Sequence, residues 1–426
     1  MSSDYYITNL LNLKDENLVF SDGIHHEFIK GIKYTVISAK LNYSNGACPH
    51  CGCSDNSMMM KYGFKPSRVR LSKSGNMPLI IDLKKQKIFC KQCGHYFLVS
   101  TNIVDKYCCI SNQVRKAIMA DLTKKCSMKD VAFDNCVSTS TVSRFMSRFD
   151  NYFNVDFNFL PKHLSFDEFK STKDARGSMS FIYCDADTHK VIDVVENRQL
   201  FFLRRYFSNF PRSVRDSVES ICIDMYSPYI SLIKDLFVNA KIVIDRFHIV
   251  QLFSRSLNQT RVDVMKGLST YSFEYKRLKK YWKTFLKPFK LLDPINFLKQ
   301  VHFPDKLVSS VDIVEMSLDC DEVLKSSYDC YQCLREDLEN NNFKLFVKHL
   351  EYFKGRVSQR MVVSIETCFK YLDYIKNTFN SPYSNGLIEG INNFIKVLKR
   401  NAFGFRRFVN FRTRIFITRN LLSRRF

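Results

Sequence analysis

The sequence lacks any long apolar run and is short of acidic residues. No stretch approaches the roughly 18 apolar residues of a membrane span, and no basic segment followed by an apolar one opens the chain, so neither membrane insertion nor a secretory signal is expected. Internal repeats and low-complexity tracts are also absent. The 42 Asp and Glu face 65 Lys and Arg, which leaves a net charge of +23 over 426 residues. This excess favours a polyanionic partner, nucleic acid first, over a basic surface that serves only solubility.

The remaining composition indicates a folded chain of several domains. With 38 Phe and 21 Tyr, a disordered basic tail is excluded, and the length allows two to four domains. The 15 cysteines, in a chain without an export signal, should be mostly reduced, and clustered ones are metal candidates. We therefore expect an intracellular protein whose cysteines stay reduced.

Two cysteine pairs, each followed by glycine, predict a zinc site. CPHCG begins at Cys48 and CKQCG at Cys90, so 38 residues separate the pairs, and the module around them is itself basic. Four thiolates from two such turns form a closed, tetrahedral and therefore structural Zn²⁺ site. The predicted ligands are Cys48, Cys51, Cys90 and Cys93, with His50, Cys53 and His95 as nearby substitutes. A third pair, Cys330 and Cys333, has no matching partner and is interpreted as free thiols.

Residues 113–149 have the layout of a helix-turn-helix. Apolar residues spaced by four predict a helix over 113–125. Ser127 and Asp130 predict a capping-box start for a short helix, MKDVAFD, and a tight turn at Asn135 and Cys136 leads from it to a second helix over 138–149. In this motif the second helix enters the major groove and its first residues reach base edges. The candidate DNA contacts are Ser140, Thr141 and Arg144. The alternative is a helical pair that only packs or dimerises.

Residues 160–260 alternate strands and helices, which indicates an α/β domain whose sheet is partly parallel. Strands are predicted at 163–169, in a hairpin at 179–198, and at 219–224 and 241–245, with a helix at 226–237; residues 250–375 read as helical. Asp167 and Asp224 lie near two strand ends, and Glu389 lies on a later helix. Three such carboxylates can hold two divalent ions. Position alone does not select them, because rivals are present: Glu168, Asp185, Asp187, Asp193 and Asp245.

The last segment, 384–426, predicts an amphipathic basic helix followed by a basic tail. Apolar residues from Ile388 to Leu398 form one stripe, and after Glu389 the chain holds ten Lys and Arg and no acidic residue. This segment is expected to hold DNA phosphates. The residues assigned to that role are Lys396, Arg400, Arg406 and Arg407.

Taken together, these segments resemble the ISL-three family of bacterial insertion-sequence transposases. The matching motifs are LSFDEF, ICIDMYSPY, VIDRFHIV and SNGLIEGINNFIKVLKRNAFGFRRFVNFRTRI, the last being the most specific. The resemblance implies a multidomain α/β chain: a lead-in (1–45), a zinc ribbon (46–100), a helix-turn-helix domain (105–155) and an RNase H-like DDE domain (160–426) with an all-helical insertion at about 255–375. It also implies a catalytic triad of Asp167, Asp224 and Glu389 that binds Mg²⁺ or Mn²⁺.

The activity implied is cleavage at terminal inverted repeats of double-stranded DNA and transfer of the freed 3′-hydroxyl to target DNA. A homodimer or larger synaptic complex is expected, since two ends must meet. The alternative from another class is a DNA-binding regulator with an inactive nuclease domain; a single-strand or RNA-binding protein is a weaker third. Asp245 and His248 stay open, as neighbours of the active centre or, slightly favoured, as a helix cap and a packed histidine.

Overall fold

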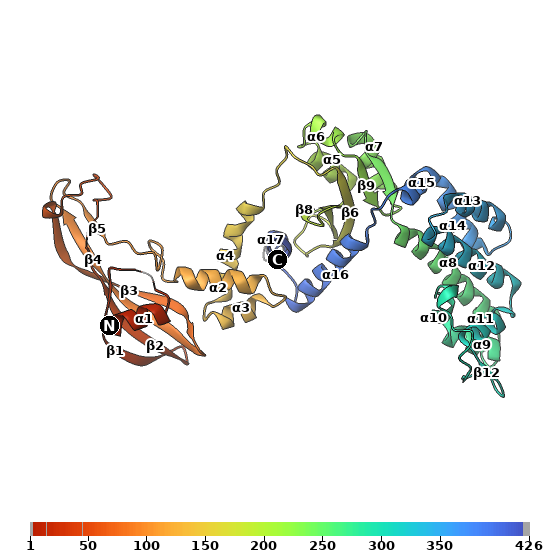
Figure 1. The fold of residues 1–426 in the computed structure, drawn as a ribbon, viewed down its shortest axis with the longest axis horizontal. Helices are drawn as coiled ribbons and strands as arrows, with labels where there is room; N and C mark the ends of the chain where they lie inside the picture. The colour runs from red at the N-terminus through yellow and green to blue at the C-terminus, as the bar shows by residue number, and fades with distance from the viewer. Residues whose placement is uncertain (1–2, 14, 45, 421–426) are drawn as a thin grey trace. The chain divides into compact units, whose positions relative to one another are not determined.

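The computed structural model describes residues 3–13, 15–44 and 46–420, and Figure 1 traces the elements along the chain. Two units are distinguished: Met1–Asn154 together with Lys396–Phe426, and Val155–Ile395. Within the described ranges, none of the helices combines the length and the apolar character needed to cross a bilayer.

The first unit begins with a five-stranded sheet that carries both cysteine pairs. Its elements are α1 (Ser3–Leu10), β1 (Leu18–Ile29), β2 (Ile32–Leu41), a 3₁₀ turn (Asn56–Met58), β3 (Met59–Ser74), β4 (Met77–Cys90) and β5 (Tyr96–Leu98). The order is β1-β2-β4-β3, with β5 paired to β4. Because β2 pairs in parallel with β4, residues set apart above as a lead-in belong to the same sheet as the cysteines.

Three helices follow this sheet, close to the predicted ranges. They are α2 (Asn112–Leu122), α3 (Met128–Asp134) and α4 (Thr139–Asp150), with a 3₁₀ turn at Asn151–Phe153. The predicted capping box is confirmed: the Ser127 side chain accepts from the Asp130 backbone, and the Asp130 carboxylate accepts from the Ser127 backbone. Cys136 has a φ of 51° in the turn that leads to α4. Apolar residues of all three helices share one small core, so the module is held by packing and by caps.

The C-terminal helix α17 (Phe408–Asn420) packs on α2 and α4 and completes this module. Ile417 is fully buried in the core of the three helices. The Arg414 guanidinium donates to the backbone carbonyls of Lys124 and Cys126, each at 2.9 Å, at the carboxyl end of α2. The sequence analysis placed all of 160–426 in one domain, whereas the structure groups the part from Lys396 with the N-terminal unit.

The second unit is built on a five-stranded sheet of order β10-β9-β6-β7-β8. Its elements are β6 (His163–Lys170), β7 (Met179–Asp185), β8 (Val191–Val195), α5 (Leu200–Phe207), α6 (Arg212–Asp216), β9 (Ser220–Ile223), α7 (Ser227–Leu236) and β10 (Lys241–Ile244). β6, β7 and β8 form an antiparallel meander, and β9 and β10 run parallel to β6. The predicted strands, hairpin and helix are confirmed. As a result β6, β8, β9 and β10 all point their carboxyl ends to one edge.

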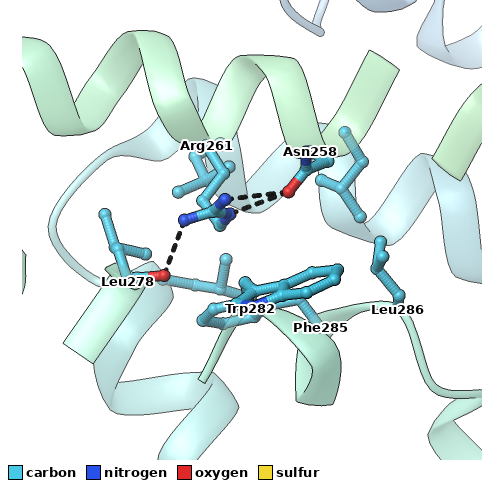
Figure 2. A pocket seen from close by; sticks show the side chains of 9 residues that line it. Asn258, Arg261, Leu278, Trp282, Phe285 and Leu286 are labelled. Carbon is cyan, nitrogen blue, oxygen red and sulfur yellow. Dashed lines mark hydrogen bonds between the residues drawn. The ribbon is translucent and has the colours of Figure 1, made fainter. Parts of the chain in front are cut away.

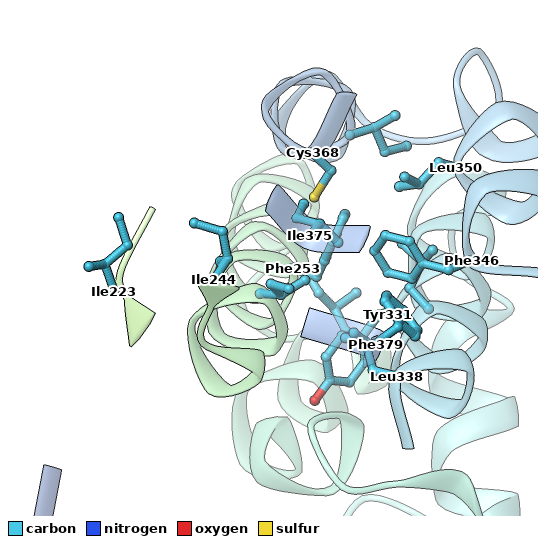
Figure 3. Packing of buried hydrophobic residues seen from close by; sticks show 14 of the residues in the cluster. Ile223, Ile244, Phe253, Tyr331, Leu338, Phe346, Leu350, Cys368, Ile375 and Phe379 are labelled. Carbon is cyan, nitrogen blue, oxygen red and sulfur yellow. The ribbon is translucent and has the colours of Figure 1, made fainter. Parts of the chain in front are cut away.

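A mainly helical region follows β10. The prediction of an all-helical insertion is wrong in one respect, because a short antiparallel ribbon interrupts the helices. Its elements are α8 (Arg246–Gly267), α9 (Phe273–Lys280), α10 (Trp282–Phe285), a 3₁₀ turn (Phe289–Leu291), a two-stranded ribbon of β11 (Leu298–Lys299) and β12 (Leu307–Val308), α11 (Ser310–Leu318), α12 (Glu322–Glu339), α13 (Phe343–Phe353), α14 (Gln359–Lys370), α15 (Leu372–Asn380) and then α16 (Gly386–Asn401). One apolar cluster joins these helices to the sheet: Figure 3 shows Ile244 of β10 beside Phe253 of α8, with Phe346 and Phe379 beyond it. Cys330 lies buried in this cluster, as expected of a free thiol.

The helical region also contains a small cavity around a buried arginine. The Arg261 side chain donates to Asn258 Oδ1 and to the Leu278 carbonyl at 2.7 Å, with Trp282, Phe285 and Leu286 around it (Figure 2). Burial lowers the pKa of Arg261. The volume of about 10 Å³ holds one water at most. We therefore conclude that Arg261 links α8 to α9 through its hydrogen bonds and does not bind a ligand.

Candidate functional site

The two cysteine pairs bring four sulfurs into the geometry of a zinc site. Sγ of Cys48 and of Cys93 lie 3.7 Å apart, as do those of Cys51 and Cys90, and all four lie within 4.8 Å of one another. A tetrahedron with Zn–S bonds of about 2.3 Å has edges of about 3.8 Å, so the four residues fit the ion. The four predicted ligands therefore form the sulfur cluster, and Cys53 lies outside it.

Glycine is required at both turns of this cluster. Gly52 and Gly94 have φ values of 73° and 71°, where a side chain is strained, and their N–H groups donate to the carbonyls of Cys48 and Cys90 at 2.8 and 2.9 Å. The substitute ligands are engaged differently: the His50 and His95 rings stack on each other at 4.9 Å, and His95 Nδ1 contacts the Cys93 carbonyl oxygen.

A row of aspartates lies where three adjacent strands meet one edge of the second sheet. Asp224 directly follows β9 and Asp245 directly follows β10. Ser165 of β6 pairs with Cys222 of β9, and two further residues along this register bring Asp167 level with Asp224. Burial, and next the charge of Asp224, raise the pKa of Asp167 to about 7. Burial likewise raises the pKa of Asp245. Crowded, partly desolvated carboxylates of this kind are stabilised by a cation.

His248 belongs to this group of carboxylates. Its Nε2 lies 2.7 Å from Asp224 Oδ1 and 3.9 Å from Asp245 Oδ2. Burial by itself lowers the pKa of His248, but the carboxylates, Asp224 first, raise it by more, and the net direction is upward. Asp245 is the N-cap residue of α8, as the slightly favoured interpretation expects, and its carboxylate also accepts from the Asn385 backbone at 3.0 Å. Both residues lie beside Asp224.

Helix α16 reaches the same strands through two buried asparagines that the sequence analysis missed. Asn385, just before α16, donates from Nδ2 to the Phe166 carbonyl at 3.2 Å and lies 3.5 Å from Asp224 Oδ1. Asn392 donates from Nδ2 to Asp167 Oδ2 at 2.5 Å. They are 2% and 6% exposed, and neither Oδ1 atom has a hydrogen-bond partner among the described residues. Two hard amide oxygens beside Asp167 and Asp224 form a donor set that suits Mg²⁺ or Mn²⁺.

Glu389 lies on the same helix face as these asparagines, four residues after Asn385 and three before Asn392. Its side chain is exposed, and in the described part of the chain no contact joins its carboxylate to Asp167 or Asp224. The structure thus brings Asp167 and Asp224 together. Glu389 lies on the helix that contacts both aspartates, but its carboxylate is too far from theirs to share a metal ion with them. The seven-residue spacing of Asn385 and Asn392, with Glu389 between them on the same helix face, is the sequence feature that could have indicated the two asparagines as site residues.

The rival carboxylates have other partners. Glu168 pairs with Arg198 and accepts from the Tyr229 hydroxyl at 2.9 Å. Asp185 closes the hairpin turn, Asp187 accepts from the Tyr383 hydroxyl, and Asp193 accepts from the Tyr206 hydroxyl.

The predicted DNA-binding residues differ in accessibility. In α4, Ser140 and Arg144 are exposed, whereas Thr141 is 8% exposed and its hydroxyl bonds with that of Ser138 at the start of the helix. Thr141 therefore stabilises the helix start and is not placed to read bases. The basic residues of the C-terminal segment are all exposed: Lys396, Arg400, Arg406 and Arg407.

Loss of the Asn392 amide should weaken both divalent-ion binding and folding. Asn392→Ala removes a donor to Asp167, and loss of such an orienting partner costs about 10- to 100-fold in metal affinity and about 1–3 kcal/mol in stability. Mn²⁺ titration of the purified protein measures the first and chemical denaturation the second. Asn393→Ala, on an exposed neighbour, is the matched control. Equal metal affinity of both variants would contradict a role for Asn392.

The cysteine cluster and the aspartates at the edge of the second sheet define a class of protein. Comparisons with known proteins identify this class as transposases with a zinc ribbon. A model of the ISL3 (ISL-three) DDE transposase domain, described as "Transposase", matches residues 164–415. A second, described as "zinc-finger of transposase IS204/IS1001/IS1096/IS1165", matches residues 44–93. The first match covers more than half of the chain. The chain therefore belongs to the ISL3 family of transposases, which confirms the resemblance seen in its sequence.

Two relatives align over different lengths. The transposase for insertion sequence element IS1001 of Bordetella parapertussis is 21% identical over 344 residues, which are 77% of this chain and 78% of that protein. A protein named "ATP-dependent protease" from Lactococcus lactis subsp. lactis is 36% identical over 118 residues, 26% of this chain. The latter alignment covers only 35% of the length of that protein.

Proposed function

We propose that this chain is a DDE transposase that cleaves the terminal inverted repeats of its own insertion sequence and joins the freed 3′-hydroxyl to target DNA. The proposal rests on the edge of the second sheet, where Asp167 and Asp224 lie level on adjacent strands. Asn392 of α16 and Asn385 just before it contact these two aspartates. The sheet, with its antiparallel meander and two added parallel strands, supports an RNase H-like fold for this domain. Family membership supports the same activity.

The proposed roles follow from the contacts. Asp167, Asp224 and Glu389 would hold divalent ions, which when bound activate the attacking hydroxyl and stabilise the leaving oxygen of the phosphodiester. Asn392 and Asn385 orient Asp167 and Asp224 and keep α16 against the sheet. His248 holds Asp224 by its 2.7 Å contact and reduces the repulsion among the carboxylates. Glu389 would complete the metal site when DNA and metal bind, since its exposed side chain lies on the same face of α16 as Asn392, which contacts Asp167.

For DNA recognition we propose that α3 and α4 form a helix-turn-helix and that the zinc ribbon and the basic C-terminal residues bind phosphates. The substrate would be double-stranded DNA in the bacterial cytoplasm, with two ends held in a homodimer or larger complex. The test is incubation of purified protein with duplex DNA carrying the element's end, with and without Mg²⁺. Metal-dependent nicking at the repeat boundary supports the proposal. End binding without nicking would instead favour a regulator with an inactive nuclease domain.

Arg144 should contribute sequence specificity. Its exposed side chain on the first turns of α4 suits bidentate contact with guanine. Arg144→Ala should weaken binding of the terminal repeat by about 1–3 kcal/mol, or roughly 10- to 100-fold, with little change for unrelated DNA. Competition gel shifts at fixed salt measure both. Arg148→Ala, one turn further along α4 and also exposed, is the control; an equal loss of specificity in both variants would argue against base reading by Arg144.

A further inference from the structure

An exposed aromatic face lies on the zinc ribbon, where β3, β4 and β5 pair beside the cysteine cluster. The register places Met60 of β3 and Tyr96 of β5 opposite Phe89 of β4. Their chain neighbours Met59 and Ile88 are 8% and 0% exposed and belong to the core behind this face. Successive side chains of a strand point to opposite faces, so the alternate residues point outward. We call this surface the aromatic face, and it consists of Met60, Tyr62, Lys87, Phe89, Tyr96 and Leu98.

The rings of the aromatic face contact one another and are open to solvent. The ring centroids of Tyr62 and Tyr96 lie 5.0 Å apart, and those of Phe89 and Tyr96 lie 4.8 Å apart. Tyr62 and Tyr96 are 52% and 44% exposed, and Met60 and Leu98 are exposed as well. An open cluster of large apolar side chains indicates a binding surface, whereas single exposed residues do not.

The aromatic face is also positively charged. Lys87 lies among the rings, with its Nζ 4.2 Å from the Tyr96 ring centroid and 5.1 Å from that of Tyr62, so cation–π contacts hold the ammonium there. Asp82 is the one acidic residue from Met59 to Leu98, and it pairs with Arg68. The same segment contains nine basic residues: Lys61, Lys65, Arg68, Arg70, Lys73, Lys84, Lys85, Lys87 and Lys91.

The zinc site fixes the geometry of this face. Cys90 directly follows Phe89, and its N–H donates to the carbonyl of His95, the residue before Tyr96, at 3.0 Å. The turn between β4 and β5 thus begins at one cluster cysteine and contains a second, Cys93. Closure of the cluster therefore sets the pairing that brings the rings of Phe89 and Tyr96 together before any ligand arrives.

Unpaired nucleobases are the ligands that suit this face best. Aromatic side chains on an open sheet bind bases by stacking, which requires a base whose flat side is free, and lysines beside them bind the phosphates. A second copy of this chain suits the face less, because pairing two such surfaces would bring their Lys87 ammonium groups and the surrounding lysines together. Charge complementarity thus favours nucleic acid over self-association.

We propose that the aromatic face binds unpaired bases of a DNA strand by stacking on Tyr62 and Tyr96. The inference rests on the proposed function for its choice of DNA, since cleavage at the element's ends creates strand termini whose bases can leave the duplex. It adds a single-stranded contact to the phosphate contacts proposed for the zinc ribbon. Lys87 holds the two tyrosine rings in place and contributes positive charge for the strand.

Tyr62→Ala and Tyr96→Ala test the stacking, since both side chains are exposed and their loss should leave the fold and the zinc content unchanged. Each change should weaken binding of an oligomer of about 15 thymidines roughly ten- to hundredfold, as for the loss of one stacked base, with little change for a blunt duplex of equal length. Fluorescence anisotropy with the full chain, in buffer without Mg²⁺, measures both affinities.

Two further variants are the controls. Tyr96→Phe keeps the ring and should bind the thymidine oligomer as the wild type does. Phe28→Ala removes a ring of β1 that is 73% exposed on the same sheet but outside the aromatic face, and it should also bind normally. A loss in Phe28→Ala as large as that in Tyr96→Ala would overturn the inference, because the effect would not be specific to this face.

An oligomer of abasic sites separates stacking from phosphate contact, because it keeps the charges and lacks the bases. Wild type and Tyr62→Ala should bind it equally. Equal binding of the thymidine oligomer by the wild type and both alanine variants overturns the inference. So does tighter binding of a uridine oligomer than of the thymidine oligomer, which would assign the face to RNA. A lower mass of Tyr62→Ala in sedimentation, with unchanged thymidine binding, also overturns it and would identify a contact between copies.

These results separate the inference from the proposed function. A wild type that nicks its ends with Mg²⁺, while its alanine variants bind the thymidine oligomer normally, retains the transposase assignment and loses the aromatic face. A wild type whose thymidine binding depends on both tyrosines but which never nicks retains the aromatic face and loses the catalytic assignment.

Discussion

Asp167→Asn, Asp224→Asn and Glu389→Gln should each reduce cleavage at the element's ends by on the order of 10³-fold or more, equivalent to about 4 kcal/mol of transition-state stabilisation. Each change keeps the shape of the side chain and removes the charge that binds metal. Binding of the end duplex in metal-free buffer should persist in all three. The measurement is the single-turnover nicking rate with Mg²⁺, with end binding followed in parallel.

The effect on stability distinguishes a catalytic aspartate from a structural one. Burial and Asp224 raise the pKa of Asp167 to about 7, so above pH 7 the metal-free fold carries a charge that the unfolded chain solvates better. Asp167→Asn removes this cost, and Tm without metal should rise by a few degrees at pH 8. The cost falls as the pH is lowered from 7 towards 4, and the gain should disappear below about pH 3, where the carboxyl is protonated in both the folded and the unfolded state.

Asp187→Asn is the matched control, since the Asp187 carboxylate accepts from the Tyr383 hydroxyl and has no contact with Asp167 or Asp224 among the described residues. It should cleave like the wild type. Glu389→Gln is the most decisive variant, because the exposed Glu389 is assigned by its helix face and by family resemblance and not by a contact. Normal nicking by Glu389→Gln would show that another residue completes the metal site.

Removal of zinc should have the second large effect. Cys48 and Cys90 are buried in the apolar core of the first sheet, at 2% and 0% exposed. Zinc binding by four thiolates contributes on the order of 10 kcal/mol to the folding of small modules. Strong chelation, or Cys48→Ser, should therefore unfold the cysteine end of this sheet and abolish end binding. Metal analysis, hydrogen exchange of β4 and gel shifts measure the three consequences.

Cys53→Ser provides the comparison, because Cys53 lies outside the four-sulfur cluster. It should retain one zinc per chain and the protection of β4. Full zinc content and unchanged exchange in Cys48→Ser would remove Cys48 from the ligand set.

Much of the architecture could be predicted from local patterns. The CxxC turns followed by Gly52 and Gly94, and the capping box at Ser127, are short-range features whose geometry a few residues determine. The strands of the second sheet were visible because each is a short apolar run that ends in a polar residue. Asp167 and Asp224 could be selected through family resemblance, although the sequence alone offered several rivals.

Long-range pairing decided what local patterns could not. Residues 1–45 lack a strong motif, yet β2 joins the cysteine-bearing sheet through its parallel pairing with β4. Asn392 has the sequence pattern of an ordinary helix residue, and its importance appears only where α16 meets β6. Thr141 seemed a DNA contact until the packing of α4 showed it buried.

The sequence by itself determined the class of this protein. The residue types needed for zinc binding and for metal-dependent chemistry occur in short motifs with fixed spacing. Only the tertiary structure decided which carboxylates meet, how His248 and two asparagines support them, and where α17 belongs. The physical reason is that local spacing sets turns, caps and helix faces, whereas desolvation and contacts between distant strands and helices exist only in the folded chain.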